Sequence, residues 1–345
     1  MPATRHSIYL LLVVSISHNS VLAEDPPTFV LEWGQSGGDT GQLQGPHGLD
    51  VDDDGIVYVA DTSNHRIQVF TPDGGYITEW GSFGTNPGEF NHPHGIGIGP
   101  DGKLYVAETG NNRVQKFTKT GTFITMWGTQ GNGPGQFLHN HGLAVDHNGN
   151  VFVADRDQNR VQKFDSDGNF ILEFGTPGTA DGQFSGTNGV AVDAAGDVFV
   201  ADTSPRIQKS TNDGVFILSW GSAGTGEGEF DFPRQISTDE IGNLYVADRN
   251  NHRMQKFTNT GEFLTVWGQF GSGPVEFFSP YAVRAGLNGV IYVADTSNNR
   301  IQRFSSAAGI PAVSQWGANV FALLILVAGT YLFRKRARRS ILVHL

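Results

Sequence analysis

The sequence contains no cysteine, and charged residues make up only 17% of its 345 positions. The absence of cysteine excludes a disulfide framework, thiol catalysis and cysteine-ligated zinc. Helices are not expected between residues 24 and 304, because that stretch has no helical periodicity. Glycine is abundant instead. Its 46 positions are near 13% of the chain, against a usual ~7%, and they lack an every-third-residue period, so they indicate many tight turns rather than collagen.

Basic residues are scarce in the body of the chain. The sequence has 34 acidic and 23 basic residues, which gives a formal net charge of −11. Setting aside six basic residues near the two ends leaves 17 bases and a formal charge of −17. Nucleic-acid binding depends on Lys and Arg against phosphates, so no DNA or RNA partner is expected. The six terminal bases are Arg5, Arg334, Lys335, Arg336, Arg338 and Arg339.

The first residues have the features of an export signal. Arg5 and His6 precede an apolar run, Ile8 to Ile16, which is too short to cross a bilayer. Val21 and Ala23 then stand three positions and one position before a break at Glu24. This pattern predicts a signal peptide over residues 1–23. The alternative is a buried first strand, which the repeats described below do not require.

The C-terminal end has the features of a membrane anchor. Residues 316–333 carry no charge, and as a helix these 18 residues would span roughly 27 Å. Five bases follow within residues 334–339, and the positive-inside rule places them in the cytoplasm. We therefore expect a linker over 305–315, a transmembrane helix over 316–333 and a basic cytoplasmic tail over 334–345. The body would be exported, in the periplasm or at the cell surface.

A short motif precedes the expected helix. It reads Ile310-Pro311-Ala312-Val313-Ser314-Gln315-Trp316-Gly317. With the apolar helix and basic cluster, it resembles the IPTL-CTERM variant of the bacterial PEP-CTERM sorting signals, and it departs from that pattern at Ala312, Val313 and Gln315. The resemblance implies a Gram-negative envelope protein and a sorting protease as a partner. A plain single-pass anchor is the alternative.

One unit is repeated six times between the two ends. The tetrapeptide Tyr58 to Asp61 recurs with its acidic residue at spacings of 47, 47, 47, 46 and 47. In the first copy, four alternating polar and apolar segments lie at residues 48–52, 56–60, 66–70 and 76–80, separated by Gly, Asp or Asn turns. Four antiparallel strands per repeat, six times over, predict an all-β, six-bladed β-propeller over residues 24–304.

The two ends of the repeat region predict how the ring closes. Phe29 to Gly34 matches the fourth strand of a copy, although no first strand precedes it. The sixth copy stops after its third strand at Phe304. The N-terminal strand is therefore expected to complete the last blade, which removes the open sheet edges.

The repeat pattern resembles the NHL family over residues 29–304. It combines Tyr-Val-Ala-Asp, then Asn-x-Arg-Ile-Gln-x-Phe, then Gly-x-Phe-x-x-x-Trp-Gly and a Gly-rich loop. Asn64-His65-Arg66 and Asn251-His252-Arg253 lie at the turn related to the family's Asn-His-Leu signature. The resemblance implies a six-bladed propeller and no single activity.

Most repeated side chains have structural explanations. Each acid ends a strand and an arginine begins the next, as in Asp61 and Arg66, so an ion-paired turn is expected in every blade. If exposed, each pair contributes only ~0–1 kcal/mol. The tryptophans that end fourth strands are expected to pack between blades. They are Trp33, Trp80, Trp127, Trp220 and Trp267, with Phe174 in the remaining set.

The candidates for function are positions that differ between blades while the rest of the repeat stays the same. One such position lies 14 residues before each acid and opens the innermost strand, on the face that carries the acid–arginine turns. Side chains from all six blades should therefore form a ring at one mouth of the central channel. These candidate ligand-binding residues are His47, His94, His141, Asn188, Arg234 and Tyr281.

Three histidines in this ring raise the possibility of a metal site. His47, His94 and His141 come from adjacent blades and would bind zinc or another divalent metal. The pattern is similar to peptidyl-hydroxyglycine amidating lyases, although those use histidines from non-adjacent blades. That resemblance implies catalytic roles for Arg234, as an oxyanion or carboxylate group, and Tyr281, as an acid–base group. The alternative is a Pro-His-Gly turn with only structural hydrogen bonds.

Two functions follow from these observations. The first is a non-enzymatic module that binds a protein, peptide or glycan at the channel mouth and the Gly-rich loops. The second is a metal-dependent lyase or hydrolase at the same mouth.

Overall fold

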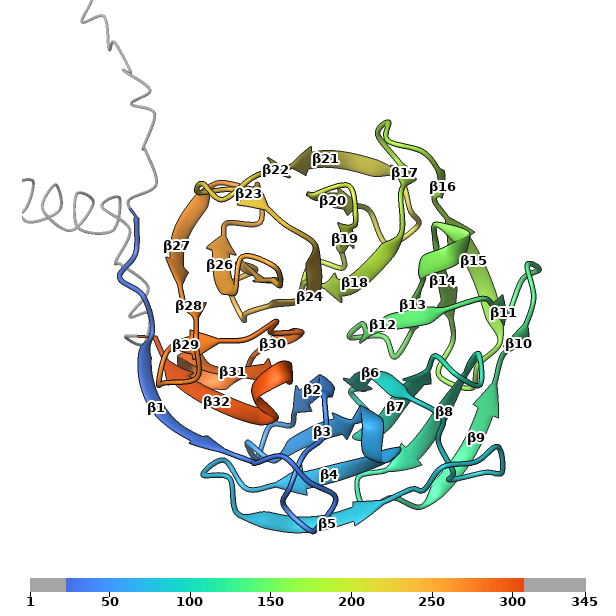
Figure 1. The fold of residues 1–345 in the computed structure, drawn as a ribbon. Helices are drawn as coiled ribbons and strands as arrows, with labels where there is room; N and C mark the ends of the chain where they lie inside the picture. The colour runs from blue at the N-terminus through green and yellow to red at the C-terminus, as the bar shows by residue number, and fades with distance from the viewer. Residues whose placement is uncertain (1–22, 307–345) are drawn as a thin grey trace, which may run out of the picture.

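The computed structural model describes residues 23–306, which form a ring of six four-stranded antiparallel sheets (Figure 1). The predicted all-β, six-bladed propeller is confirmed. From the innermost to the outermost strand, the blades are β2(Pro46–Val51), β3(Val57–Asp61), β4(Arg66–Phe70), β5(Tyr76–Trp80); β6(Pro93–Ile98), β7(Lys103–Glu108), β8(Arg113–Thr118), β9(Phe123–Trp127); β12(Asn140–Val145), β13(Val151–Asp155), β14(Arg160–Phe164), β15(Phe170–Phe174); β18(Thr187–Val192), β19(Val198–Asp202), β20(Arg206–Ser210), β21(Phe216–Trp220); β24(Pro233–Thr238), β25(Leu244–Asp248), β26(Arg253–Phe257), β27(Phe263–Trp267); and β30(Ala282–Ala285), β31(Val290–Asp295), β32(Arg300–Ser305), β1(Thr28–Trp33).

Short elements connect these strands. The Gly-rich loops between blades contain two-residue parallel pairings, with isolated bridges at the first two loops, Ser36–Leu43 and Phe83–Phe90. The paired segments are β10(Thr129–Gln130) and β11(Gln136–Phe137), β16(Thr176–Pro177) and β17(Gln183–Phe184), β22(Ser222–Ala223) and β23(Glu229–Phe230), and β28(Gln269–Phe270) and β29(Glu276–Phe277). Four 3₁₀ turns are η1(Thr62–Asn64), η2(Arg156–Gln158), η3(Leu287–Gly289) and η4(Thr296–Asn298).

The ring closes as the sequence predicts. Strand β1 lies antiparallel beside β32, with Thr28 opposite Ser305 and Trp33 opposite Ile301. The first described strand therefore completes the sixth blade (Figure 1). Because β1 covers β32, the third strand of the sixth blade is not left as an open edge at which another chain could add.

The tryptophans pack between blades, as expected. Trp33 of blade 6 lies 5.9 Å from the Phe70 ring of blade 1, centroid to centroid. The same indole covers the turn at Gly74, where φ is +80° and a Cβ would lie 2.7 Å from the Trp33 ring. Glycine at this turn therefore serves two needs, the left-handed backbone and the close approach of the indole.

The expected acid–arginine pair forms in every blade, and the pairs are buried. The Asp61 side chain is fully buried, and it accepts hydrogen bonds from Arg66 Nε at 2.8 Å and Gln68 Nε2 at 3.0 Å. The Arg66 guanidinium also donates to the carbonyls of Gly38, Asp39 and Gln42. The Gly-rich loop thus folds over each pair and removes it from water. The equivalent pairs are Glu108–Arg113, Asp155–Arg160, Asp202–Arg206, Asp248–Arg253 and Asp295–Arg300.

Glycines allow the innermost strands to lie close together. A Cβ at Gly48 would lie 1.9 Å from the backbone oxygen of His94 in the next blade. Gly95 and Gly142 are similarly restricted, since a Cβ would lie 2.6 and 2.7 Å from the oxygens of His141 and Asn188. The close approach narrows the channel directly beside the candidate ring.

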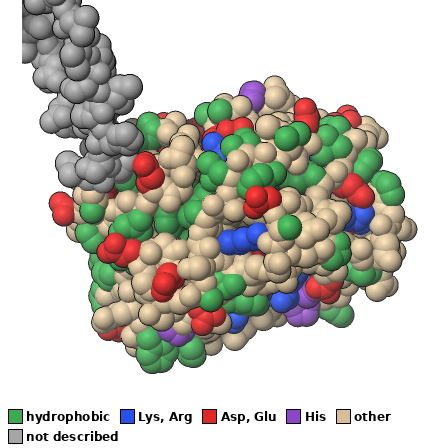
Figure 2. Space-filling view, turned by 90° about the horizontal axis from the view of Figure 1, so that it is seen from above, with side chains coloured by type: hydrophobic (Ala, Val, Ile, Leu, Met, Phe, Trp, Pro, Cys, Tyr) green, Lys and Arg blue, Asp and Glu red, His purple; other side chains and the backbone are tan. Residues whose placement is uncertain are grey.

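Several sequence predictions fall outside the described residues. Residues 1–22 of the predicted signal peptide, most of the linker, the predicted transmembrane helix over 316–333 and the basic tail all belong to this group. Within residues 23–306, no helix has the length and apolar character to cross a membrane. Acidic side chains are scattered over the edge of the ring that Figure 2 shows.

Candidate functional site

The structure brings all six candidate residues together at one mouth of the channel. Tyr281 Oη lies 2.9 Å from His141 Nδ1 and 3.3 Å from His94 Nδ1. His94 Nε2 in turn lies 3.0 Å from His47 Nδ1. The His47 imidazole stacks on the Tyr281 ring with centroids 4.1 Å apart. Side chains from four blades therefore contact one another across the axis.

Arg234 and Asn188 complete this mouth ring. Arg234 NH1 donates to Asn188 Oδ1 at 3.1 Å and to Tyr281 Oη at 3.3 Å. Asn188 Nδ2 donates to the Pro233 carbonyl of the next blade at 2.9 Å. The mouth ring, defined as the six candidate residues, is thus one connected polar network.

Burial sets the charge of the mouth ring. Burial, with Arg234 nearby, lowers the pKa of His47 to about 3. Burial also lowers the pKa values of His94 and His141 well below their usual range, and it raises the pKa of Tyr281. The pKa of Arg234 falls to about 10, again chiefly through burial. At neutral pH the imidazoles are uncharged and Arg234 carries the positive charge of the ring.

This geometry does not fit a metal site. Both ring nitrogens of His94 face other side chains, His47 and Tyr281, rather than a common point with the other imidazoles. The positive charge of Arg234 lies beside them. Within residues 23–306, no group of three or more His, Asp or Glu side chains is arranged to hold a metal ion. The zinc role of His47, His94 and His141 therefore stays a prediction without geometric support.

Three residues beside the mouth ring were not predicted from the sequence: Phe232, Arg156 and Arg249. The Phe232 ring has guanidinium carbons around it at 4.2 Å for Arg234, 5.8 Å for Arg156 and 6.0 Å for Arg249. Across the described part of the chain, none of these three arginines forms a salt bridge. This arrangement, which we call the arginine cluster, places uncompensated positive charge on an otherwise acidic protein.

Departures from the repeat could have revealed the arginine cluster. The residue after each repeated acid is threonine in four blades, and three of these hydroxyls donate to a carbonyl of the next blade, as Thr62 does to Pro93 at 2.7 Å. Arg156 and Arg249 replace this threonine.

Phe232 lies at a position that varies between the blades. Five of the six equivalent residues have a left-handed backbone: Gly45, His92, Gly186, Phe232 and Ser279. Phe232 holds a φ of +61° there. A bulky side chain in this conformation costs free energy and marks a candidate functional position.

Comparison with known families identifies the repeat. The NHL repeat model matches residues 43–70 and 230–257, and a six-bladed β-propeller model matches residues 99–184. Two segments of the chain, in the first and fifth blades, therefore match the NHL repeat. Two curated proteins share short stretches with this chain. Protein lin-41 from Caenorhabditis elegans is 39% identical over 61 residues, and E3 ubiquitin-protein ligase TRIM71 from Rattus norvegicus is 49% identical over 47 residues. The matches cover 18% and 14% of this chain but only 5% and 6% of those proteins.

Solved structures share the fold at low identity. Virginiamycin B lyase from Staphylococcus aureus matches with a TM-score of 0.57 and 17% identity, over 80% of this chain and 98% of that one. A protein of unknown function from Bacteroides thetaiotaomicron matches with a TM-score of 0.61 and 15% identity, over 83% and 75%. At such identities the likeness concerns the propeller fold alone.

Proposed function

We propose that this protein is an exported, membrane-anchored NHL propeller that binds an anionic group of a peptide, protein or glycan in the bacterial envelope. The observation that supports the proposal is the arginine cluster, in which Arg156, Arg234 and Arg249 surround Phe232 without an acidic partner. Export rests on the signal peptide predicted over 1–23. Anchoring, and recognition by a sorting protease, rest on the motif and helix predicted over 310–333.

The chemistry of the cluster favours a carboxylate. Arg234 is buried and next to two further arginines, so its positive charge is only weakly solvated. A carboxylate would accept charge-assisted hydrogen bonds in the planar geometry that guanidinium groups favour. The Phe232 ring supports the guanidinium faces by cation–π contact. Because Arg234 Nη1 already bonds Asn188 and Tyr281, Arg156 and Arg249 would supply most of the hydrogen bonds to a ligand.

Binding of an acidic peptide and an acidic glycan tests the proposal. We expect the purified full chain in a neutral detergent to bind hexaglutamate or a galacturonate oligomer, measured by calorimetry at low salt. The double variant Arg156→Gln/Arg249→Gln should lose at least tenfold in affinity. The matched control is Arg303→Gln, which removes an arginine paired with the exposed Asp73 away from the mouth. Equal affinity in the double variant, or no binding of either probe, would rule out the proposal.

A lyase or hydrolase is the second candidate. The fold neighbour named as virginiamycin B lyase is the observation that favours it. Elemental analysis of the purified protein distinguishes the two functions. Stoichiometric zinc that is lost in His94→Ala would support the metal-dependent enzyme, whereas a folded, metal-free protein would support the binding module.

A further inference from the structure

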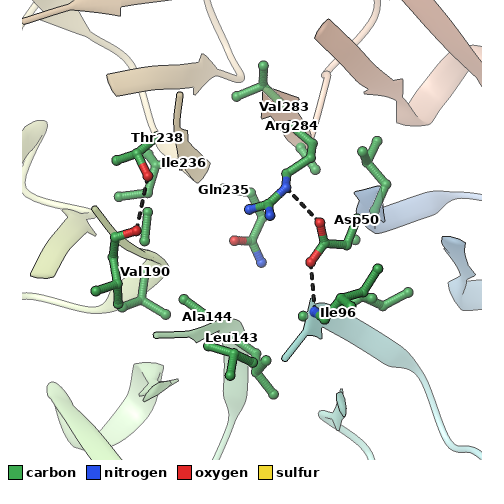
Figure 3. Close-up of a pocket in the computed structure, with 18 residues that line it drawn as sticks. Asp50, Ile96, Leu143, Ala144, Val190, Gln235, Ile236, Thr238, Val283 and Arg284 are labelled. Carbon is green, nitrogen blue, oxygen red and sulfur yellow. Dashed lines mark hydrogen bonds and ion pairs between the residues drawn. The ribbon is translucent and has the colours of Figure 1, made fainter. Parts of the chain in front are cut away.

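A separate cavity of about 110 Å³ lies inside the channel (Figure 3). Residues of the innermost strands line it, among them Ile96, Leu143 and Val190, but most of the surface that faces the cavity is polar. Asp50, Gln235 and Arg284 bring large polar side chains to it, and Figure 3 shows the Gln235 amide and the Arg284 guanidinium pointing into its centre. The mouth ring is not part of this lining.

The three polar residues depart from the repeat. The positions equivalent to Gln235 in the other blades hold glycine four times and alanine once. The positions equivalent to Asp50 and Arg284 hold Gly97, Ala144, Ala191 and Ser237. Small residues therefore satisfy the architecture at these positions, and the packing of the blades does not require polar side chains there.

The Asp50–Arg284 pair fixes the guanidinium at the cavity. Arg284 Nε lies 2.6 Å from Asp50 Oδ1, and Asp50 also accepts hydrogen bonds from the backbone N–H groups of Val51 and Ile98. The carboxylate is thereby fully engaged and offers little to a cation. Among the lining residues drawn in Figure 3, Asp50 is the sole partner of Arg284, so the terminal nitrogens of Arg284 remain free for a ligand.

Gln235 supplies the second indication of a ligand. The residue as a whole is 8% exposed, and Figure 3 draws no hydrogen bond from the lining residues to its amide. The amide atoms are not among the fully buried, unsatisfied polar atoms of the described residues, so they are accessible from the cavity and can bond a bound molecule or water there. Here the free amide and the free guanidinium nitrogens face the same space.

We propose that the channel cavity binds a small monocarboxylate such as acetate. The terminal nitrogens of Arg284 would donate to both carboxylate oxygens, and Gln235 Nε2 would donate a further hydrogen bond. The volume suits a ligand of a few heavy atoms and excludes a drug-sized one. Arg284 also lines two shallow depressions that contain Asp53, outside the cavity, so the ligand would enter past this side chain rather than through the mouth ring.

A carbon-13 acetate titration of the full chain in neutral detergent tests this site. We expect saturable binding with a dissociation constant on the order of millimolar, because a ligand of four heavy atoms makes few contacts. The Arg284→Gln variant should bind at least tenfold more weakly, and Gln235→Ala several-fold more weakly. Arg303→Gln is the matched control and should bind as the wild type does.

Two further variants keep the test decisive. Arg284→Gln leaves Asp50 without its partner, so the double variant Asp50→Ala/Arg284→Ala, which restores small residues like those of other blades, should fold and still lose acetate binding. Arg156→Gln/Arg249→Gln should retain channel binding, which separates this site from the arginine cluster. Unchanged acetate affinity in the Asp50→Ala/Arg284→Ala variant, or no saturable binding to the wild type, would mean that the cavity holds only water.

Discussion

At the scale of the residue, some functional candidates can be found from the repeat by counting along the chain, and others only by aligning the blades. The mouth ring follows from a fixed offset to the repeated acid, so a count along the sequence was sufficient to place His47 through Tyr281. Arg156 and Arg249 each replace the threonine that the other four blades hold after the repeated acid, and this difference is visible only when the blades are aligned position by position. The burial that suppresses the imidazole charges depends on contacts across the axis, which no single repeat contains.

The mouth ring should make stability depend on pH below neutrality. Folding lowers the pKa values of His47, His94 and His141, so the unfolded state binds more protons below its histidine pKa of about 6.5. The stabilising contribution is therefore complete above that pH and is lost as the pH falls towards the folded values, about 3 for His47. We expect the wild-type melting temperature to fall more steeply between pH 7 and pH 4.5 than that of His94→Gln.

The charged groups near the mouth ring also act to lower the histidine pKa values. The groups that act on the mouth ring through their positive charge include Arg234, Arg249, Arg156, His92 and His139, and all of them lower the histidine pKa values. The control is His147→Gln at an exposed position, which should follow the wild-type profile. Parallel wild-type and His94→Gln profiles would contradict the assignment.

At the scale of the element, the repeat predicts strands well and their surroundings poorly. The four segments expected in the first copy, 48–52, 56–60, 66–70 and 76–80, correspond to β2 to β5 within two residues at each end. Alternation and turn residues suffice for this, because both are local. The burial of the acid–arginine turns was missed because the Gly-rich loop that covers each pair lies over 20 residues earlier in the chain, as Gly38 does relative to Arg66.

The buried turns should be important for stability. The change Asp61→Ala removes the acceptor for Arg66, Gln68, Asn64 and the Gln44 amide, and it leaves the buried Arg66 guanidinium with the partly exposed Glu79 as its remaining carboxylate partner. We expect a loss of about 3–5 kcal/mol in the free energy of unfolding, measured by urea denaturation. In the control Asp73→Ala, which breaks an exposed pair with Arg303, the loss should stay below about 1 kcal/mol. Similar losses in the two variants would show that the turn is not held by its ion pair.

At the scale of the whole molecule, the closure between β1 and β32 determines the architecture, and it was predictable because an unpaired fourth strand preceded the first complete copy. It joins residues 28 and 305, which are opposite each other in the register. Cooperative unfolding should depend on this contact, since all other blades close with strands that are near in sequence.

A disulfide across this closure tests its role. Because the chain has no cysteine, the double variant Thr28→Cys/Ser305→Cys can form only one intramolecular bridge. We expect it to oxidise spontaneously and to stabilise the protein by about 2–4 kcal/mol relative to the same variant in reductant, measured by thiol titration and urea unfolding. Thiols that stay free would contradict the register, and a bridge without stabilisation would show that the ring opens elsewhere first.

The arrangement of the tryptophans gives the ring an optical property. Each of the five indoles within residues 23–306 lies between two blades, with its Nε1 atom buried and without a hydrogen-bond partner. Separation of two neighbouring blades at their contact, here called a seam, would expose that indole to water and shift its fluorescence emission to longer wavelength. Phe174 holds the corresponding place in blade 3, against Gly214 of blade 4. Emission therefore reports five of the six seams and is silent for the one between blades 3 and 4, where a Phe174→Trp substitution would complete the set of reporters.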